Sequence, residues 1–126
     1  MIVGLGIDAI DISRIERMIE GKKDRVLRRL FSEGELRYVD SKIAPAQHIA
    51  VRLAAKEAAY KALAGNELAR GIGWRDVEVL TRDDGSPELL MHGRAAQRFA
   101  EIGATRSHVS LTHSQATAVA VVILEG

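Results

Sequence analysis

The feature that most constrains the fold is an alanine-rich helical pattern, "RLAAKEAAYKAL", at residues 52–63. Successive residues of an α-helix are about 100° apart, so five alanines form one wide face of small side chains. These are Ala54, Ala55, Ala58, Ala59 and Ala62. Such a face can approach a sheet or another helix closely. We predict a tightly packed helix over residues 46–64, beginning near Pro45 and ending at Gly65.

Other apolar periodicities predict a strand near each end of the chain, with helices and a hairpin between them. Residues 2–7 form a β-type run, and helical spacing follows it. Residues 25–41 have the pattern of two short helices, with a break at Gly34 or an N-cap at Ser32. The later expected elements are a hairpin around "DDGSP", a helix over residues 93–103, and strands over residues 107–113 and 117–124. This order indicates a single α+β domain, residues 1–126, with a largely antiparallel sheet packed against helices.

The overall charge excludes a strong electrostatic preference for nucleic acid or membrane, because 18 basic residues face 17 acidic ones. The longest apolar run, residues 116–124, is well short of the ~20 residues that span a bilayer. The start, "MIVGLGID", lacks the pattern of a signal peptide. The absence of cysteine excludes thiolate chemistry and fits a reducing compartment. We therefore expect a soluble, cytoplasmic protein.

Glu57 and Lys61 lie four residues apart in the alanine-rich helix, about 40° from each other on one flank. From spacing alone, the favoured interpretation is a surface salt bridge worth only ~0.2–0.5 kcal/mol. The alternative is that the two side chains belong to an active site beside the packed face.

Asp8 follows the first apolar run, at the point where strand is expected to give way to helix. A carboxylate there, joined by one from a helix, would suit magnesium, which usually takes one or two protein carboxylates together with phosphate oxygens and water. A nearby lysine would hold phosphate or ease proton transfer. The alternative for Asp8 is helix capping, shared with Asp11.

Residues 14–29 contain seven basic and three acidic side chains, a local charge of +4. Three of the basic side chains and one apolar side chain could share one side if the helix continues through Gly21: Arg14, Arg17 and Arg25, with Met18. This side is either a docking surface for an acidic protein or an ordinary solvated face. Nucleic acid is a poor fit because the chain has few aromatic side chains and none lies among these basic residues.

Near the C-terminus, "SHVSLTHS" places His108, Ser110 and Thr112 on one side of a predicted strand. Three motifs, "GLGID", "RLAAKEAAYKAL" and "HVSLTHS", occur in an order that resembles the small bacterial holo-acyl-carrier-protein synthases. These are a class of 4'-phosphopantetheinyl transferases, and the resemblance covers nearly the whole chain. It departs from the family pattern at Leu53 and Thr117, where relatives often have aromatic residues.

The resemblance implies a 4'-phosphopantetheinyl transferase-like fold and transfer of the phosphopantetheine arm of coenzyme A to a serine of apo acyl carrier protein, in fatty acid biosynthesis. Adenosine 3',5'-bisphosphate would be released. Magnesium is the implied metal, with Asp8 and Glu57 as its protein ligands. Lys61 would lie at the phosphate or near the attacking hydroxyl. Whether Glu57, Lys61 or a metal-bound water takes the serine proton is left open.

The resemblance also implies which side chains surround coenzyme A, with His108 as the candidate for its 3'-phosphate. The full set is Arg52, Gly85, Pro87, His108, Ser110 and Thr112, and Lys56 is a further candidate for a phosphate. A homotrimer with sites between subunits is implied, and the basic side of residues 14–29 would receive the carrier protein. We interpret Glu35 as a helix-surface carboxylate. The competing hypothesis is a non-catalytic module that binds an acidic protein through residues 14–29.

Overall fold

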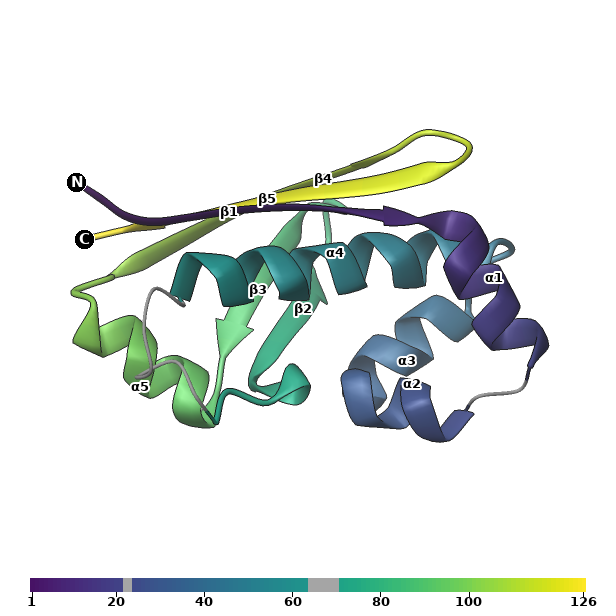
Figure 1. Cartoon of the computed structure of the whole chain (residues 1–126), viewed down its shortest axis with the longest axis horizontal. Coiled ribbons are helices and arrows are strands. Elements are labelled where there is room, and N and C mark those ends of the chain that lie inside the picture. The colour runs from purple at the N-terminus through teal and green to yellow at the C-terminus, as the bar shows by residue number, and fades with distance from the viewer. Residues whose placement is uncertain (22–23, 64–70) are drawn as a thin grey trace.

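The computed structural model describes residues 1–21, 24–63 and 71–126. A long helix lies along one face of a three-stranded sheet, with a small hairpin and shorter helices on the far side of that helix (Figure 1). The helices are α1 (Ile12–Glu20), α2 (Asp24–Leu30), α3 (Glu33–Asp40), α4 (Pro45–Leu63), α5 (Gly93–Glu101) and the 3-10 turn η2 (Trp74–Asp76). The strands are β1 (Ile2–Asp11), β2 (Val77–Thr81), β3 (Pro87–Met91), β4 (Arg106–His113) and β5 (Thr117–Glu125).

The larger sheet has the strand order β1-β5-β4, and every pairing in it is antiparallel. The smaller sheet is the antiparallel hairpin of β2 and β3. Both sheets pack against α4, whose middle is buried from Ile49 to Lys56. The predicted α+β class with antiparallel sheets is therefore confirmed.

Two glycines of β1 let α4 lie directly on the strand. A Cβ added to Gly6 would come within 1.8 Å of the carbonyl oxygen of Ala58, and one added to Gly4 within 2.4 Å of the carbonyl oxygen of Ala62. No side chain fits between the two backbones at these points. Because side chains of a strand alternate, Asp8 is the next residue of β1 to face α4.

The boundaries of the first elements differ from those predicted. β1 continues to Asp11, which pairs with Thr117, so Asp8 lies inside the strand rather than at its end. Asp11 occupies the N-cap position of α1 but makes no side-chain cap hydrogen bond within the described chain. The capping interpretation of Asp8 is therefore wrong, because the residue lies four positions before α1.

The predicted pair of short helices is confirmed, with the boundary at Ser32. Its hydroxyl accepts a hydrogen bond from the backbone N–H of Glu35, while the Glu35 carboxylate accepts one from the backbone N–H of Ser32. This capping box starts α3. The predicted end of the long helix at Gly65 lies outside the described residues.

The sheet has two contrasting faces. The face toward α4 buries Ala118, Ala120, Val122 and Leu124 of β5. The opposite face exposes apolar side chains of β1, with Leu5 and Ile7 each about 60% accessible. Within residues 1–21, 24–63 and 71–126, no helix is long and apolar enough to cross a bilayer.

Candidate active site

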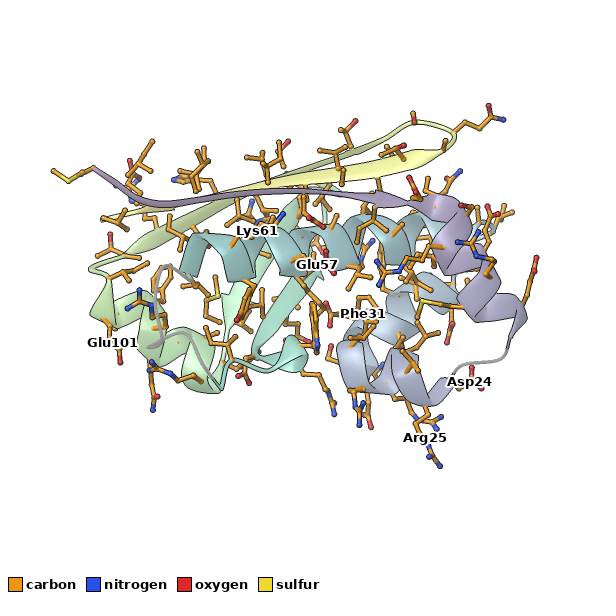
Figure 2. All side chains as sticks on the ribbon, in the orientation of Figure 1. Asp24, Arg25, Phe31, Glu57, Lys61 and Glu101 are labelled. Carbon is orange, nitrogen blue, oxygen red and sulfur yellow. The ribbon has the colours of Figure 1, made fainter. Side chains whose placement is uncertain are left out.

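The structure brings Asp8 of β1 together with Glu57 and Lys61 of α4, although 49 residues separate the two carboxylates in the chain. Lys61 Nζ lies 2.8 Å from Asp8 Oδ1 and donates a second hydrogen bond, 3.0 Å long, to the carbonyl oxygen of Ile7. Figure 2 shows Glu57 and Lys61 on the stretch of α4 that runs beside β1. Lys61 therefore forms its ion pair with Asp8 of β1. The surface salt bridge with Glu57, which helical spacing favoured, does not hold this lysine in place.

The two carboxyl groups interact strongly with each other. Burial, a hydrogen bond with Asp8 and the charge of Asp8 together raise the pKa of Glu57 to about 7. Burial also acts on Asp8, but hydrogen bonds with Glu57 and Lys61, together with the charge of Lys61, hold the pKa of Asp8 below its usual value. When both carboxylates are ionised, their two negative charges exceed the single positive charge of Lys61, which is paired with Asp8.

This site fits a divalent cation. Asp8 Oδ2 is buried and receives no hydrogen bond from the described residues, so an electron-rich oxygen lacks a positive partner. A cation between Asp8 and Glu57 would supply that partner and remove the repulsion that raises the pKa of Glu57. Among the described residues, no group of three or more His, Cys, Asp or Glu side chains could hold a metal. A two-carboxylate site suits magnesium, which commonly takes its other ligands from phosphate and water.

A second cluster lies around the start of α4 and gathers several residues that the sequence placed at coenzyme A. A cleft of about 220 Å³ is lined by Arg52, Gly85, Pro87 and Thr112, together with His113. Tyr38 and His48 also line this cleft. We call it the basic cleft. The hairpin turn and the end of β4 therefore meet beside α4.

The side chain of Arg52 is positioned to bind an anion in the basic cleft. Its guanidinium donates to the carbonyl oxygen of His48 and to Thr81 Oγ1, at 3.0 and 2.9 Å, and lies 4.3 Å from the centre of the Tyr38 ring. Its Nε is buried without an acceptor, and no carboxylate of the described residues forms an ion pair with it. Burial and the charges of Arg52, Lys42 and His113 lower the pKa of His48. This crowding of positive groups favours a bound anion.

His108 lies elsewhere. Its Nε2 is 3.3 Å from Glu125 Oε1, and its side chain lines a separate cleft between β3 and β4 with Arg82 and Arg106. His113, on the opposite face of the same strand, reaches the basic cleft. The sequence did not single out three side chains that line the basic cleft, His113, Tyr38 and His48. The basic cleft lies at the end of β4, where Thr112 and His113 from both faces of the strand line it, whereas His108 lies near the start of the strand.

Lys56 is not available to a phosphate, contrary to expectation, because it is buried and its ammonium is bonded within the protein. Glu35, expected on a helix surface, is also buried. These two residues bond to each other across the interior at 2.9 Å.

The basic residues of α1 lie beside the carboxylates. Arg14 is close enough for its charge to oppose the rise in the pKa of Glu57. Arg14 and Arg17 are exposed, and Met18 is half-buried. The helix does not continue through Gly21, because α1 ends at Glu20 and α2 is a separate helix. Arg25 therefore projects from α2, away from Glu57 (Figure 2).

The site combines a carboxylate pair suited to magnesium with an adjacent lysine and a nearby basic cleft. A transferase that acts on a phosphate ester needs these groups. Comparison with known proteins identifies the class. The family model of the 4'-phosphopantetheinyl transferase superfamily matches residues 4–121, and the chain belongs to this superfamily.

Within this superfamily, the relatives of the chain are holo-acyl-carrier-protein synthases. The chain is 46% identical over 125 residues to the holo-[acyl-carrier-protein] synthase of Geobacter metallireducens, with 99% of this chain and 98% of the relative covered. The corresponding protein of Nitratidesulfovibrio vulgaris strain DP4 is 48% identical, with 99% of both chains covered. The expected family is therefore confirmed.

Solved structures of holo-acyl-carrier-protein synthases have the same fold as this chain. The holo-[acyl-carrier-protein] synthase of Neisseria meningitidis superposes with a TM-score of 0.86 at 26% identity, covering 100% of both chains. The synthase of Bacillus anthracis in complex with CoA (3',5'-ADP) has a TM-score of 0.77 at 33% identity, covering 98% of this chain and 96% of that one. The predicted phosphopantetheinyl transferase-like fold and enzyme class are confirmed.

Proposed function

We propose that residues 1–126 act as one domain that transfers the 4'-phosphopantetheine group of coenzyme A to a serine of apo acyl carrier protein. Adenosine 3',5'-bisphosphate is the second product. The observation that carries this proposal is the convergence of Asp8, Glu57 and Lys61, from two distant motifs, around a buried oxygen that lacks a positive partner. The cytoplasmic location remains a prediction from the sequence.

In this reaction, the serine hydroxyl forms a new bond to the phosphorus next to pantetheine, and the bond from that phosphorus to the bridging pyrophosphate oxygen breaks. Asp8 and Glu57 would hold magnesium, which neutralises charge on the pyrophosphate when bound. Lys61 is anchored by Asp8 and Ile7 yet remains about half exposed, so its ammonium can also contact a phosphate oxygen. Asp8 thus orients the lysine as well as contributing a ligand.

The basic cleft is the proposed position of the nucleotide phosphate. Arg52 supplies positive charge there, and His113, Gly85, Pro87 and Thr112 complete the wall. Arg52 and Glu57 are five residues apart and lie about 140° from each other around α4, so one helix would serve two different sites in a trimer with sites between subunits. Ser110 and His108 lie on the outer face of the sheet, and His108 lines the neighbouring cleft with Pro87.

We further propose a homotrimer whose sites lie between subunits. The support is the exposed apolar outer face of the sheet, where Leu5 and Ile7 lie beside Ile123 and Val121 of β5. Exposed contiguous apolar surface of this kind is typical of an interface. Ser110 and Thr112 of β4 flank this face, so packing of subunits would bring them close to a neighbour.

Replacing Ile7 by lysine is expected to dissociate the trimer, because a charge placed on a packed apolar face must be desolvated. Sedimentation equilibrium measures the mass of the assembly. The matched control is Val26→Lys, at an exposed apolar position of α2 away from the sheet, which should leave the mass unchanged. A variant Ile7→Lys that keeps the wild-type mass, or a wild-type protein that is monomeric, would rule out this interface.

The exposed basic side of α1 is the proposed docking surface for the acidic carrier protein. Reversing the charges of Arg14 and Arg17 to glutamate should raise KM for the carrier by at least about tenfold and flatten its dependence on salt. KM for coenzyme A should change little. The control is the same reversal at Arg28 and Arg29 on α2. An unchanged KM for the carrier in the α1 variant would show that docking occurs elsewhere.

The function itself is tested by incubating the protein with apo acyl carrier protein, coenzyme A and magnesium, followed by mass spectrometry of the carrier. We expect the carrier to gain the mass of one phosphopantetheine. A carrier in which the acceptor serine is replaced by alanine should gain nothing. No mass gain by the wild-type carrier over a range of pH and metal concentration would refute the proposed function.

A further inference from the structure

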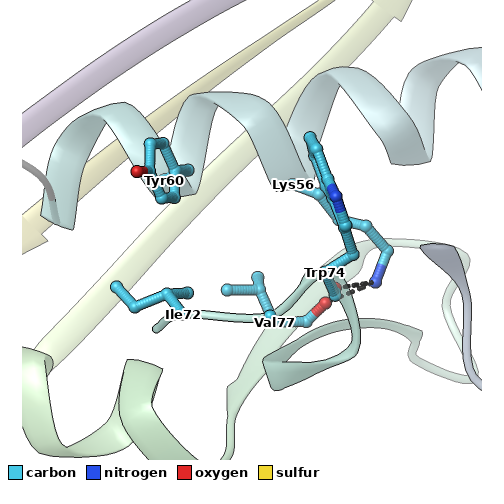
Figure 3. Close-up of a pocket in the computed structure, with 6 residues that line it drawn as sticks. Lys56, Tyr60, Ile72, Trp74 and Val77 are labelled. Atoms are coloured by element: carbon cyan, nitrogen blue, oxygen red, sulfur yellow. Dashed lines mark hydrogen bonds between the residues drawn. The ribbon is translucent and has the colours of Figure 1, made fainter. Parts of the chain in front are cut away.

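A buried ion pair lies on the side of α4 turned away from β1. Lys56 Nζ is 2.9 Å from Glu35 Oε1, and each side chain is only 1% exposed. The ammonium also donates hydrogen bonds to the carbonyl oxygens of Trp74, at 3.0 Å, and Val77, at 2.5 Å. Figure 3 shows Lys56 reaching from α4 to Trp74 and Val77. All three ammonium hydrogens therefore have acceptors.

The carboxylate of Glu35 is equally well satisfied. Besides Lys56, it accepts hydrogen bonds from the backbone N–H of Ser32, at 2.8 Å, and of Val79, at 3.0 Å. The pair consequently ties α4 to α3, η2 and β2 through directional bonds between buried side chains and the backbone.

This arrangement matters because it holds the side of α4 turned away from β1, whereas the side toward β1 is held by close backbone contact and by the two hydrogen bonds of Lys61. The helix contacts β1 through glycine and alanine, which have no long side chains to interlock. A rotation of α4 about its axis would move Glu57, the neighbour of Lys56, relative to Asp8. Because apolar residues of similar volume often replace a buried ion pair without loss of stability, stability alone does not account for the pair.

We propose that the ion pair of Glu35 and Lys56 is a positioning element that sets the rotation of α4 and so places Glu57 against Asp8. Neither residue touches the reacting atoms. The pair acts through the main chain of α4, by anchoring the residue next to Glu57 to three other elements. This inference rests on the proposed function, since its consequence appears in turnover.

The test is the double variant Glu35→Gln/Lys56→Met, which removes both charges together and keeps the side-chain volumes close to the original. Neither partner is then left as an unpaired buried charge. We expect a folded protein whose kcat is about 10- to 100-fold below wild type, because a displacement of about 1 Å can cost as much as ~100-fold. KM for coenzyme A should stay within about threefold, since the basic cleft is unchanged.

A variant that is only less stable serves as the control. Leu124→Ala removes a fully buried side chain of β5, four residues beyond Ala120, the partner of Asp8, and should lower the melting temperature because it leaves a cavity. Assayed well below its melting temperature, it should keep kcat within about threefold of wild type. If the double variant also keeps kcat within that range, or loses no more than Leu124→Ala at matched stability, the pair is merely structural and the proposal fails.

If the double variant does not fold, Glu35→Asp decides the matter. It keeps the charge but withdraws the carboxylate by one methylene, so kcat should fall at least about threefold with KM for coenzyme A unchanged. Wild-type kcat in this variant would overturn the proposal. A wild-type protein that transfers nothing would instead refute the proposed function, so the two failures are distinguishable.

Discussion

Replacement of Glu57 by glutamine is expected to lower turnover by about a thousand-fold while leaving the fold intact. Glutamine keeps the size of the side chain but loses the negative charge that a divalent cation and the phosphate chemistry require. Transfer is measured by mass spectrometry of the carrier under single-turnover conditions. Carrier binding through α1 should persist, because Glu57 lies on α4 and the proposed docking side chains lie on α1.

The same variant has a predicted effect on stability of the metal-free protein. Because the pKa of Glu57 is raised to about 7 in the folded protein, the folded state holds the proton more tightly than the unfolded chain does. Its stabilising contribution is complete below the unfolded pKa of about 4.5 and is lost as pH rises through 7. At pH 8, therefore, Glu57→Gln should melt at the same temperature as wild type or higher. At pH 4 its melting temperature should not exceed that of wild type.

The control for Glu57→Gln is Glu33→Gln, at an exposed position of α3, which should retain full activity. Turnover by Glu57→Gln within about tenfold of wild type would contradict a direct role in the reaction. A melting temperature well below wild type at pH 8 would contradict the electrostatic description of the carboxylate pair.

The largest predicted effect on stability is that of Gly6→Ala. The added Cβ would stand 1.8 Å from the carbonyl oxygen of Ala58 and 2.8 Å from its carbonyl carbon, so the backbone of α4 or β1 must move. We expect a loss of about 3 kcal/mol or more, at the upper end of overpacking effects. This corresponds to a fall in melting temperature of at least about 10 °C. Thermal unfolding followed by circular dichroism measures it.

Gly34→Ala is the matched control, because its Cβ would meet no atom closer than 3.7 Å and its position in α3 is helical. Its effect should be small and, from helix propensity, favourable. Equal melting temperatures for Gly6→Ala and wild type would show that the close contact between β1 and α4 is not what positions Asp8 against the helix.

The convergence at the site was only partly predictable from the sequence. The alanine face of the helix indicated a close contact with another element. The glycines at alternate positions of β1 form the other side of that contact, but nothing in one sequence shows that the two surfaces meet. The end of β1 was missed because Asp8 and Asp11 interrupt its apolar pattern. Pairing of β1 with β5 nevertheless extends the strand through both residues.

The remaining differences between the predictions and the structure come from contacts between residues that are distant in the chain. Glu35 has the sequence surroundings of a surface residue, and only the approach of Lys56, 21 residues away, allows its burial. His113 could not be preferred over His108 without knowing that Arg52 and the hairpin turn lie at that end of β4. In both cases, tertiary packing rather than local pattern decides the role.

The central claim, that Asp8 and Glu57 together hold the magnesium needed for transfer, is tested most directly by a metal titration. Carrier modification is measured against magnesium concentration for wild type and for Asp8→Asn, which keeps the size of the side chain. We expect no transfer by wild type after chelation of metal, full recovery with magnesium, and at least about a tenfold higher magnesium requirement in Asp8→Asn. Transfer that persists in chelator, or an unchanged magnesium requirement in Asp8→Asn, would contradict this claim.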